Sequence, residues 1–159
     1  MVPMNSLRHR LRSERGAELI EFALVFPVLL LVVLGIVDFG FLFQRMEVVT
    51  NAAREGARMA VLPGYTQADV ESRVCNYILT GGVPMTTCGP TGSTVVTVNM
   101  AFPIAVPSGT PMGAKRVEVV YTHHYLFIGP MISWFGGSLA QVPIKGVAIM
   151  RDEVQAAGP

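Results

Sequence analysis

The longest hydrophobic stretch of the chain begins at Phe22 and ends at Phe43. It holds 22 residues and a single charged side chain, that of Asp38. As a helix, this stretch would extend about 33 Å at ~1.5 Å per residue, which is enough to cross the hydrocarbon core of a bilayer. The pattern therefore predicts one transmembrane helix over residues 22–43.

A helical pattern continues beyond this stretch, because residues 44–61 contain no proline and many good helix formers. Pro63 and Gly64 then end the pattern, so we expect one long helix over residues 17–62. Small residues form a strip along its second half: Ala52, Ala53, Gly56, Ala57 and Ala60. Such a strip lets another backbone approach closely. Packing on this protein's own sheet and packing against a partner helix are both open interpretations.

Other residues of the long helix are candidates for distortion or contact. Pro27 removes a backbone donor and crowds the carbonyl of Ala23, so we expect a kink that neighbouring helices would shield. Asp38 lies near the outer end of the span, where it either reaches interfacial water or pairs with a partner helix. Arg54 and Arg58 are four residues apart on a face away from the small-residue strip, and they are candidate partner contacts.

A second helix is predicted after Gly64. Thr66 and Asp69 have the spacing of a capping box, in which each side chain bonds the backbone N–H of the other residue. Hydrophobic residues then recur at helical spacing, at Val70, Val74 and Ile78. Two glycines at positions 81 and 82 end the helix.

From Thr94 onward the hydrophobic period changes to two, which indicates a half-buried strand. Further strands are predicted at residues 115–127 and 144–150. The fold class is therefore α+β. We expect a long N-terminal transmembrane helix that extends into a small outer domain, residues 63–159, with a second helix and about three antiparallel strands.

Charge is distributed unevenly along the chain. Residues 1–16 carry four arginines and one glutamate, a net +3 (4 − 1), so the remainder carries −2 (1 − 3) against a total of +1. This segment has no hydrophobic periodicity, and we expect it to be a disordered basic leader. Basic residues beside a span indicate its cytoplasmic side, which places the outer domain across the membrane. Nucleic-acid binding is not indicated, because no basic patch remains in the outer domain.

The chain has two cysteines, Cys75 and Cys88, and both lie on the predicted outer side. An even number of cysteines in an oxidising compartment favours a disulfide. Closing a loop of about 14 residues would add ~3 kcal/mol to the free energy of unfolding in the chain-entropy model. Two free buried thiols are the alternative.

Residue types that carry catalysis form no recognisable set. His123 and His124 are adjacent on a predicted strand, so their side chains point to opposite faces and cannot bind one metal together. No serine, histidine and aspartate have a triad's spacing, and no glycine-rich loop follows a strand. We therefore expect no enzyme activity, no cofactor, no metal site and no small-molecule substrate.

The segment before the hydrophobic stretch contains Gly16, Ala17, Glu18 and Glu21. This arrangement resembles the processing site of type IV pilin-like proteins. The resemblance implies that a prepilin peptidase cuts after Gly16, leaving Ala17 as the first residue and Glu21 as the fifth. The new amine of Ala17 would lose water when such helices bundle, and a carboxylate of a neighbouring subunit would compensate that charge. Glu18 shares the helix face of Glu21 and is assigned with it to processing and assembly.

The resemblance extends further along the helix, to the TadE-like family of minor pilin-like proteins from the tight-adherence (Flp) secretion system. It rests on these residues: Gly16, Glu21, Phe26-Pro27, Asp38-Phe39-Gly40, Ala53-Arg54-Glu55-Gly56-Ala57-Arg58 and the ending Ile149–Glu153. The similarity is specific over about residues 16–61. The resemblance implies a pilin-like fold and, as partners, prepilin peptidase, other pilin-like subunits, the bilayer and the tight-adherence inner-membrane platform.

Two functions follow as hypotheses. The first is a minor pseudopilin of the bacterial inner membrane, with its N-terminus cytoplasmic, its outer domain periplasmic and incorporation into a pilus as one outcome. The large outer domain would crowd a thin fibre, which favours a minor subunit over a major one. The alternative is an uncleaved, single-pass anchored protein whose outer domain binds a surface or secretion-system partner.

Overall fold

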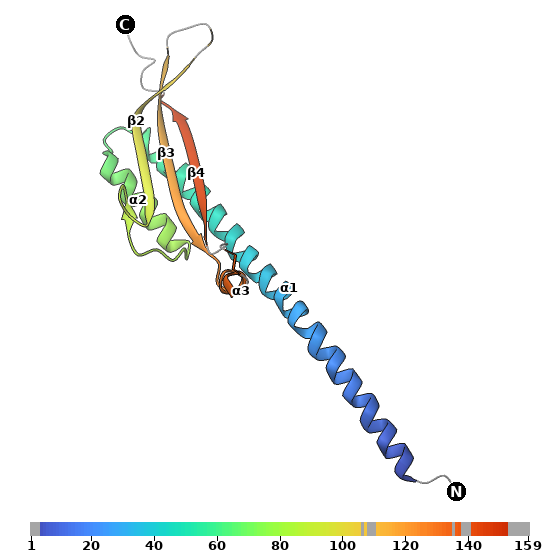
Figure 1. Cartoon of the computed structure of the whole chain (residues 1–159). Coiled ribbons are helices and arrows are strands. Elements are labelled where there is room, and N and C mark those ends of the chain that lie inside the picture. The colour runs from blue at the N-terminus through green and yellow to red at the C-terminus, as the bar shows by residue number, and fades with distance from the viewer. Residues whose placement is uncertain (1–3, 106, 108–110, 135, 138–140, 153–159) are drawn as a thin grey trace, which may run out of the picture.

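The computed structural model describes residues 4–105, 107, 111–134, 136–137 and 141–152, with only the backbone given for residues 4–15 and 134. A long helix carries a small α+β head around one of its ends (Figure 1). This helix, α1, spans Met4–Ala60. It ends before Pro63 as expected, but it begins 13 residues before Ala17. The expectation of disorder is therefore wrong for the described residues from position 4 to position 16.

Helix α2 spans Gln67–Thr80 and begins with the predicted capping box. The backbone N–H of Thr66 donates to Asp69 Oδ2 at 2.8 Å, and the N–H of Asp69 donates to Thr66 Oγ1 at 3.3 Å. Hydrogen bonds from Thr66 hold the pKa of Asp69 below its usual value. The three predicted apolar positions, Val70, Val74 and Ile78, are all buried.

Four strands form one sheet in the order β1-β2-β3-β4. Strands β2 (Thr94–Ile104), β3 (Met112–His124) and β4 (Gln141–Arg151) pair antiparallel, which confirms the three predicted strands. Strand β1 (Cys88–Gly89) pairs parallel with β2 and was not predicted, because two residues are too short to have a periodicity.

The end of β3 differs from the prediction for a physical reason. The sequence predicted a strand up to Phe127, but β3 ends at His124 and a short helix, α3, spans Ile128–Trp134. The backbone N–H groups of Leu126, Phe127 and Ile128 do not join the sheet. They bind a side chain of α1 instead.

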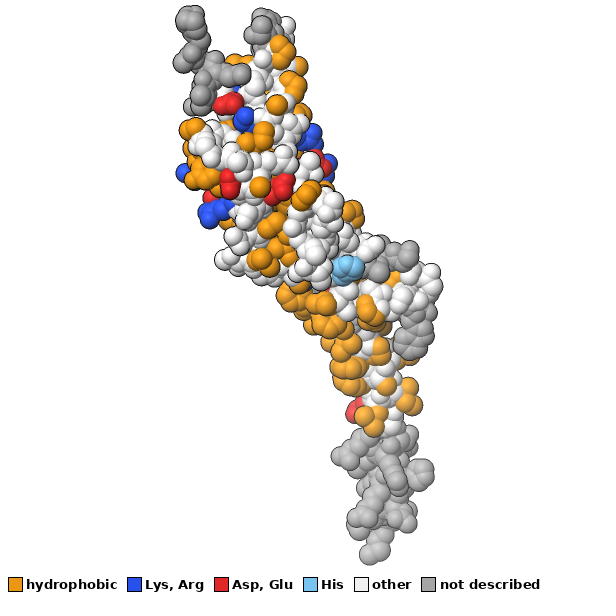
Figure 2. Space-filling model, turned by 90° about the vertical axis from the view of Figure 1, so that its left-hand side faces the viewer, with side chains coloured by type: hydrophobic (Ala, Val, Ile, Leu, Met, Phe, Trp, Pro, Cys, Tyr) orange, Lys and Arg blue, Asp and Glu red, His pale blue; other side chains and the backbone are white. Residues whose placement is uncertain are grey.

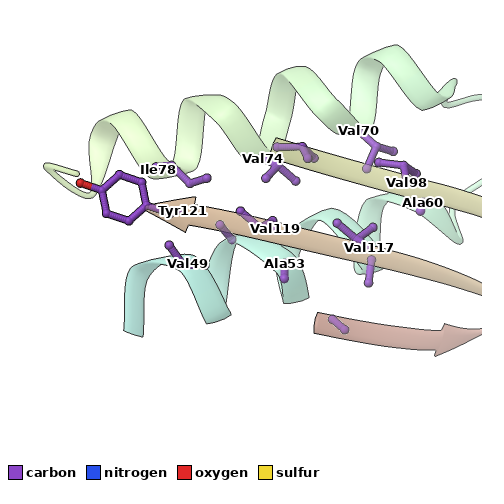
Figure 3. Packing of buried hydrophobic residues seen from close by; sticks show 14 of the residues in the cluster. Val49, Ala53, Ala60, Val70, Val74, Ile78, Val98, Val117, Val119 and Tyr121 are labelled. Atoms are coloured by element: carbon purple, nitrogen blue, oxygen red, sulfur yellow. The ribbon is translucent and has the colours of Figure 1, made fainter. Parts of the chain in front are cut away.

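Helices α1 and α2 cover one face of the sheet and form the core with it (Figure 3). Cross-strand partners such as Val96 with Val119 and Val98 with Val117 supply the sheet's share of this core. A Cβ atom placed on Gly146 of β4 would lie 2.7 Å from the carbonyl oxygen of Val49. The glycine therefore allows β4 to approach the backbone of α1 directly.

The predicted disulfide is present. Cys75 of α2 and Cys88 of β1 are bonded, with their Cα atoms 5.8 Å apart. The bond fastens α2 to the edge of the sheet at β1, which places the bridge wholly within the head.

Candidate processing site and helix–head junction

Most of the first half of α1 projects beyond the head (Figure 1). From position 17 to position 37, every side chain is exposed except Leu34 and Gly35, which are half-buried. Within the described residues, this is the one helix long and apolar enough to cross a membrane. Figure 2 shows hydrophobic side chains along it. We call residues 17–37 the bare half of α1.

The predicted processing residues lie at the start of the bare half. Gly16 and Ala17 are inside α1, so the peptide bond between them is part of a continuous helix. Glu18 and Glu21 are exposed. Three residues apart on a helix, their carboxylates lie on neighbouring parts of one face, available to a group outside the chain.

Pro27 lies inside α1, and the helix continues through it. Proline lacks a backbone N–H, so one carbonyl of the preceding turn lacks its helical donor. The neighbouring side chains of Phe26 and Val28 are exposed. Shielding of this position by another helix remains a prediction about an assembly.

The small-residue strip packs inside the chain. Ala52, Ala53, Gly56, Ala57 and Ala60 are all buried in the head core. A Cβ atom placed on Gly56 would collide with Val74 of α2 and would lie 3.2 Å from Val117 of β3. Of the two interpretations, packing on this protein's own sheet therefore describes the structure.

Arg54 and Arg58 are exposed on the opposite side of α1 from this core. Arg54 Nη1 donates to Asn51 Oδ1 at 3.4 Å, a long contact within one turn of the same helix. Both guanidinium groups lie at the surface of the head. Their role as partner contacts remains a prediction.

Asp38 marks the junction where the bare helix meets the head. Its side chain is 1% exposed, and its carboxylate accepts three backbone hydrogen bonds. Oδ1 receives the N–H of Leu126 at 3.0 Å, whereas Oδ2 receives those of Phe127 at 2.9 Å and Ile128 at 2.7 Å. The expectation that Asp38 reaches interfacial water is wrong. The carboxylate binds its own chain rather than a partner helix. The turn and the first residue of α3 present three N–H groups that have no acceptor within that helix.

A second polar contact lies about two turns further along α1. Arg45 Nη1 is 2.6 Å from Nδ1 of His123, at the end of β3. A guanidinium only donates, so Nδ1 accepts and the imidazole is neutral with its proton on Nε2. Burial, together with the positive charge of Arg45, lowers the pKa of His123, which stabilises this neutral form. His124 is exposed on the other face of β3, as the alternation predicted.

Aromatic rings complete the junction. Tyr125 lies edge-on to His123, with ring centroids 5.1 Å apart, and edge-on to Phe39 of α1 at 6.3 Å. The guanidinium of Arg45 lies 5.8 Å from the ring centroid of Phe41. These contacts fix the end of β3 and the turn before α3 against one face of α1.

Sequence reasoning found Asp38 as an isolated charge but missed its partners. The only available signal was that no charged residue occurs between His124 and Lys145. A segment without charge is suited to contact with an apolar helix. Among the described residues, no three histidine, cysteine or acidic side chains are grouped so as to hold a metal ion. The junction is an arrangement that positions two elements.

A single apolar helix long enough to cross a membrane, with an α+β head around its end, defines the architecture of a single-pass membrane protein. Residues 16–58 match the model of the TadE-like protein family, which associates the chain with the tight-adherence pilus. The resemblance expected from the sequence is confirmed over these residues. The match begins at Gly16, includes Asp38 and ends at Arg58, so it covers most of α1 and leaves α2 and the sheet unmatched. No curated protein and no solved structure matches the chain.

Proposed function

We propose that this protein is a minor pseudopilin that takes part in assembly of tight-adherence (Flp) pili. It would be anchored in the bacterial inner membrane by residues 22–43, with its N-terminus cytoplasmic and its head periplasmic. The observation that carries the proposal is the bare half of α1. Its bulky apolar side chains need lipid or neighbouring helices around them, and a glutamate stands five residues after Gly16 at its start.

Processing supplies the chemical reason for that glutamate. Cleavage by a prepilin peptidase after Gly16 gives Ala17 a positive α-amino group at the end of an apolar helix. An unpaired charge costs several kcal/mol when it leaves water, so a helix that moves from lipid into a bundle needs a counter-charge for this amine. Glu21 of a neighbouring subunit would provide it, and the exposure of Glu21 supports this role.

The size of the head supports a minor role. The described elements after residue 62, helices α2 and α3 and the sheet, make one end of α1 much broader than the bare helix (Figure 1). Subunits of this shape cannot pack at the spacing of helix-only pilins along a thin fibre. The head would act by binding other pilin-like subunits or the inner-membrane platform, with no catalysis, cofactor, nucleic acid or small-molecule substrate.

The test is the mass of the intact protein from its native membrane, measured with and without its prepilin peptidase. A chain that begins at Ala17 only when the peptidase is present is the expected result. A full-length chain in both strains would overturn processing and with it the pseudopilin role.

A second candidate function has one observation in its favour. Helix α1 runs from Met4 through Gly16 without interruption, so a peptidase would first have to unwind a turn of helix. An uncleaved, single-pass anchored protein, whose head binds a surface or secretion-system partner, needs no such step. This candidate predicts a mature protein that keeps residues 8–15 and stays in the membrane when pili are sheared from cells.

A further inference from the structure

The segment Leu126–Ser133 lies beside the apolar part of α1. Asp38 binds the backbone at its start, and a Cβ atom placed on Gly35 would lie 3.7 Å from Cδ1 of Ile128. Figure 1 shows α3 next to α1 at the base of the head. Asp38 and Gly35 precede the end of the apolar run at Phe43 by five and eight residues. At ~1.5 Å per residue, this places the segment about 7 to 12 Å inside the end of that run.

The side chains of this segment suit an apolar environment. Leu126 is 54% exposed and Phe127 is 39% exposed, although neither has a polar atom to offer water. Exposed rings of α1 lie at the same level of the helix, those of Phe39, Phe41 and Phe43. Figure 2 shows hydrophobic side chains that cover the base of the head and continue down the helix. This surface, Leu126–Ser133 together with residues 39–43 of α1, is called the basal surface.

The backbone of the segment is also adapted to a place without water. A turn that enters lipid has to satisfy its N–H groups inside the protein, because the hydrocarbon cannot. The three N–H groups before α3 are satisfied by one carboxylate, and that carboxylate is itself 1% exposed. A carboxylate at this position of an apolar helix is expensive unless it is fully hydrogen-bonded. These hydrogen bonds therefore offset two free-energy costs, that of burying the Asp38 carboxylate and that of burying the N–H groups of the turn.

We propose that the basal surface is a second membrane contact, which lies in the outer leaflet among the acyl chains below the headgroups. The proposal rests on the proposed function in one respect, that residues 22–43 span the bilayer. Lipid is the occupant because the surface is continuous with the span and its α3 segment has no charged side chain that could specify a protein partner. With this contact the head sits on the membrane at a fixed height and cannot swing freely about α1.

One tryptophan placed on the basal surface tests this proposal. Trp134 is the single tryptophan of the sequence, so Trp134→Phe combined with Phe127→Trp leaves one tryptophan at an exposed aromatic position of that surface. The full-length protein would be reconstituted in vesicles whose lipids carry bromine either near the headgroup end or near the far end of the acyl chains. We expect both lipids to quench the fluorescence of this Phe127→Trp probe. Iodide in the water should quench it weakly.

Two variants calibrate the depth scale. In the first, Trp134→Phe combined with Leu31→Trp moves the probe to the middle of the span, where distal bromine should quench more strongly than proximal bromine. In the second, Trp134→Phe combined with Tyr65→Trp moves it to an exposed site between α1 and α2, at the far end of the head. There, iodide should quench and bromine should not.

The outcomes separate the inference from the proposed function. Quenching of the Phe127→Trp probe by iodide but not by bromine would overturn the inference, provided that the Leu31→Trp probe is quenched by bromine. Protection of the Phe127→Trp probe from both quenchers would also overturn it, since a second copy or another protein would then cover the surface. Loss of bromine quenching at the Leu31→Trp probe would instead contradict the span, and with it the proposed function.

Discussion

The two halves of α1 both carry apolar side chains, yet the surroundings of those side chains are opposite. In the bare half, leucine, valine, isoleucine and phenylalanine side chains are exposed. Between Val49 and Ala60, where alanine and glycine predominate, the apolar side chains on one face are buried under α2 and the sheet. Hydropathy separates the uniformly apolar run from the second half, in which apolar and charged residues alternate, and side-chain size explains which backbones can approach each half. Small residues let the backbone of β4 reach that of α1, while bulky ones keep other backbones away and present a surface for lipid or for neighbouring helices.

The largest expected effect tests what the bare half does. Glu21→Gln removes the proposed counter-charge of the Ala17 amine but leaves the apolar run unchanged. We expect membrane insertion to be retained and incorporation into pili, or cleavage after Gly16, to be lost. Fractionation of cells followed by detection of the protein in membranes and in sheared pili measures both.

Glu18→Gln provides the matched control. It removes an equal charge three residues away, at an exposed position on the same helix. If the carboxylates of Glu18 and Glu21 only interact with lipid headgroups, the two variants should behave alike. Full incorporation of the Glu21→Gln protein would contradict the role of this carboxylate in assembly.

The next largest effect is expected at the junction between the two halves. Asp38→Ala leaves three buried N–H groups without their acceptor, and each such group costs about 1–3 kcal/mol. The turn before α3 should then open, and amide exchange of Leu126, Phe127 and Ile128 should accelerate by roughly a hundredfold, since ~1.4 kcal/mol corresponds to a factor of ten. Hydrogen–deuterium exchange followed by mass spectrometry of the protein in nanodiscs measures this.

Asp38→Asn keeps one acceptor oxygen and should give an intermediate acceleration. Peptides from α2 and from the centre of β3 should exchange at wild-type rates in both variants, because the core does not depend on Asp38. Unchanged protection of residues 126–128 in the Asp38→Ala protein would show that the turn is held by other contacts.

A pair of glycine substitutions tests the effect of burial along α1, at Gly56 in the packed half and at Gly40 between the two halves. Gly56→Leu inserts a large side chain where even a Cβ atom collides with Val74, so we expect the free energy of unfolding to fall by about 2 kcal/mol or more. Gly40→Leu places the same side chain where nothing lies within 4 Å, and leucine favours a helix more than glycine does. Urea unfolding in detergent, followed by near-ultraviolet circular dichroism, should show no loss for Gly40→Leu. Equal losses of stability in the two variants would mean that the burial of Gly56 does not distinguish it from Gly40.

Much of the head could be predicted because its signals are local. The capping box of Thr66 and Asp69, the stripe of α2 and the period-two alternation of β2 each occupy a few consecutive residues, and all three appear in the structure. The disulfide followed from the number of cysteines and their compartment. The start of α1 at Met4 was missed because its first residues are polar and have no hydrophobic period, although nothing in them breaks a helix.

The junction could not be predicted because its contacts join residues far apart in the sequence. Asp38 and Ile128 are separated by 90 positions, and Arg45 and His123 by 78. In the sequence Asp38 was a lone charge near water, while Tyr125 to Phe127 continued the hydrophobic pattern of a strand. Only the fold shows that the end of that strand turns towards α1 and gives its N–H groups to the carboxylate.

The smallest expected effect is a dependence of the free energy of unfolding on pH, which arises in the head alone. His123 is buried beside the positive charge of Arg45, with Asp38 and the exposed His124 as the other charged or titratable groups near it, and its pKa lies below the ordinary 6.5. The folded protein therefore binds fewer protons than the unfolded chain between these two pKa values, so stability falls as the pH decreases through 6.5. Between about pH 7.5 and about pH 5.5, we therefore expect this group to lower the free energy of unfolding.

The two adjacent histidines allow this dependence to be assigned. His123→Gln should remove it, because the amide does not titrate and its oxygen can still accept a hydrogen bond from Arg45. His124→Gln should keep it, since that side chain is exposed and points away from the core. Urea unfolding of the three proteins at several pH values measures the difference. The bare half of α1 contains no histidine, so its helicity should stay constant over this range, and a parallel loss of helicity there would mean that the two halves unfold as one unit.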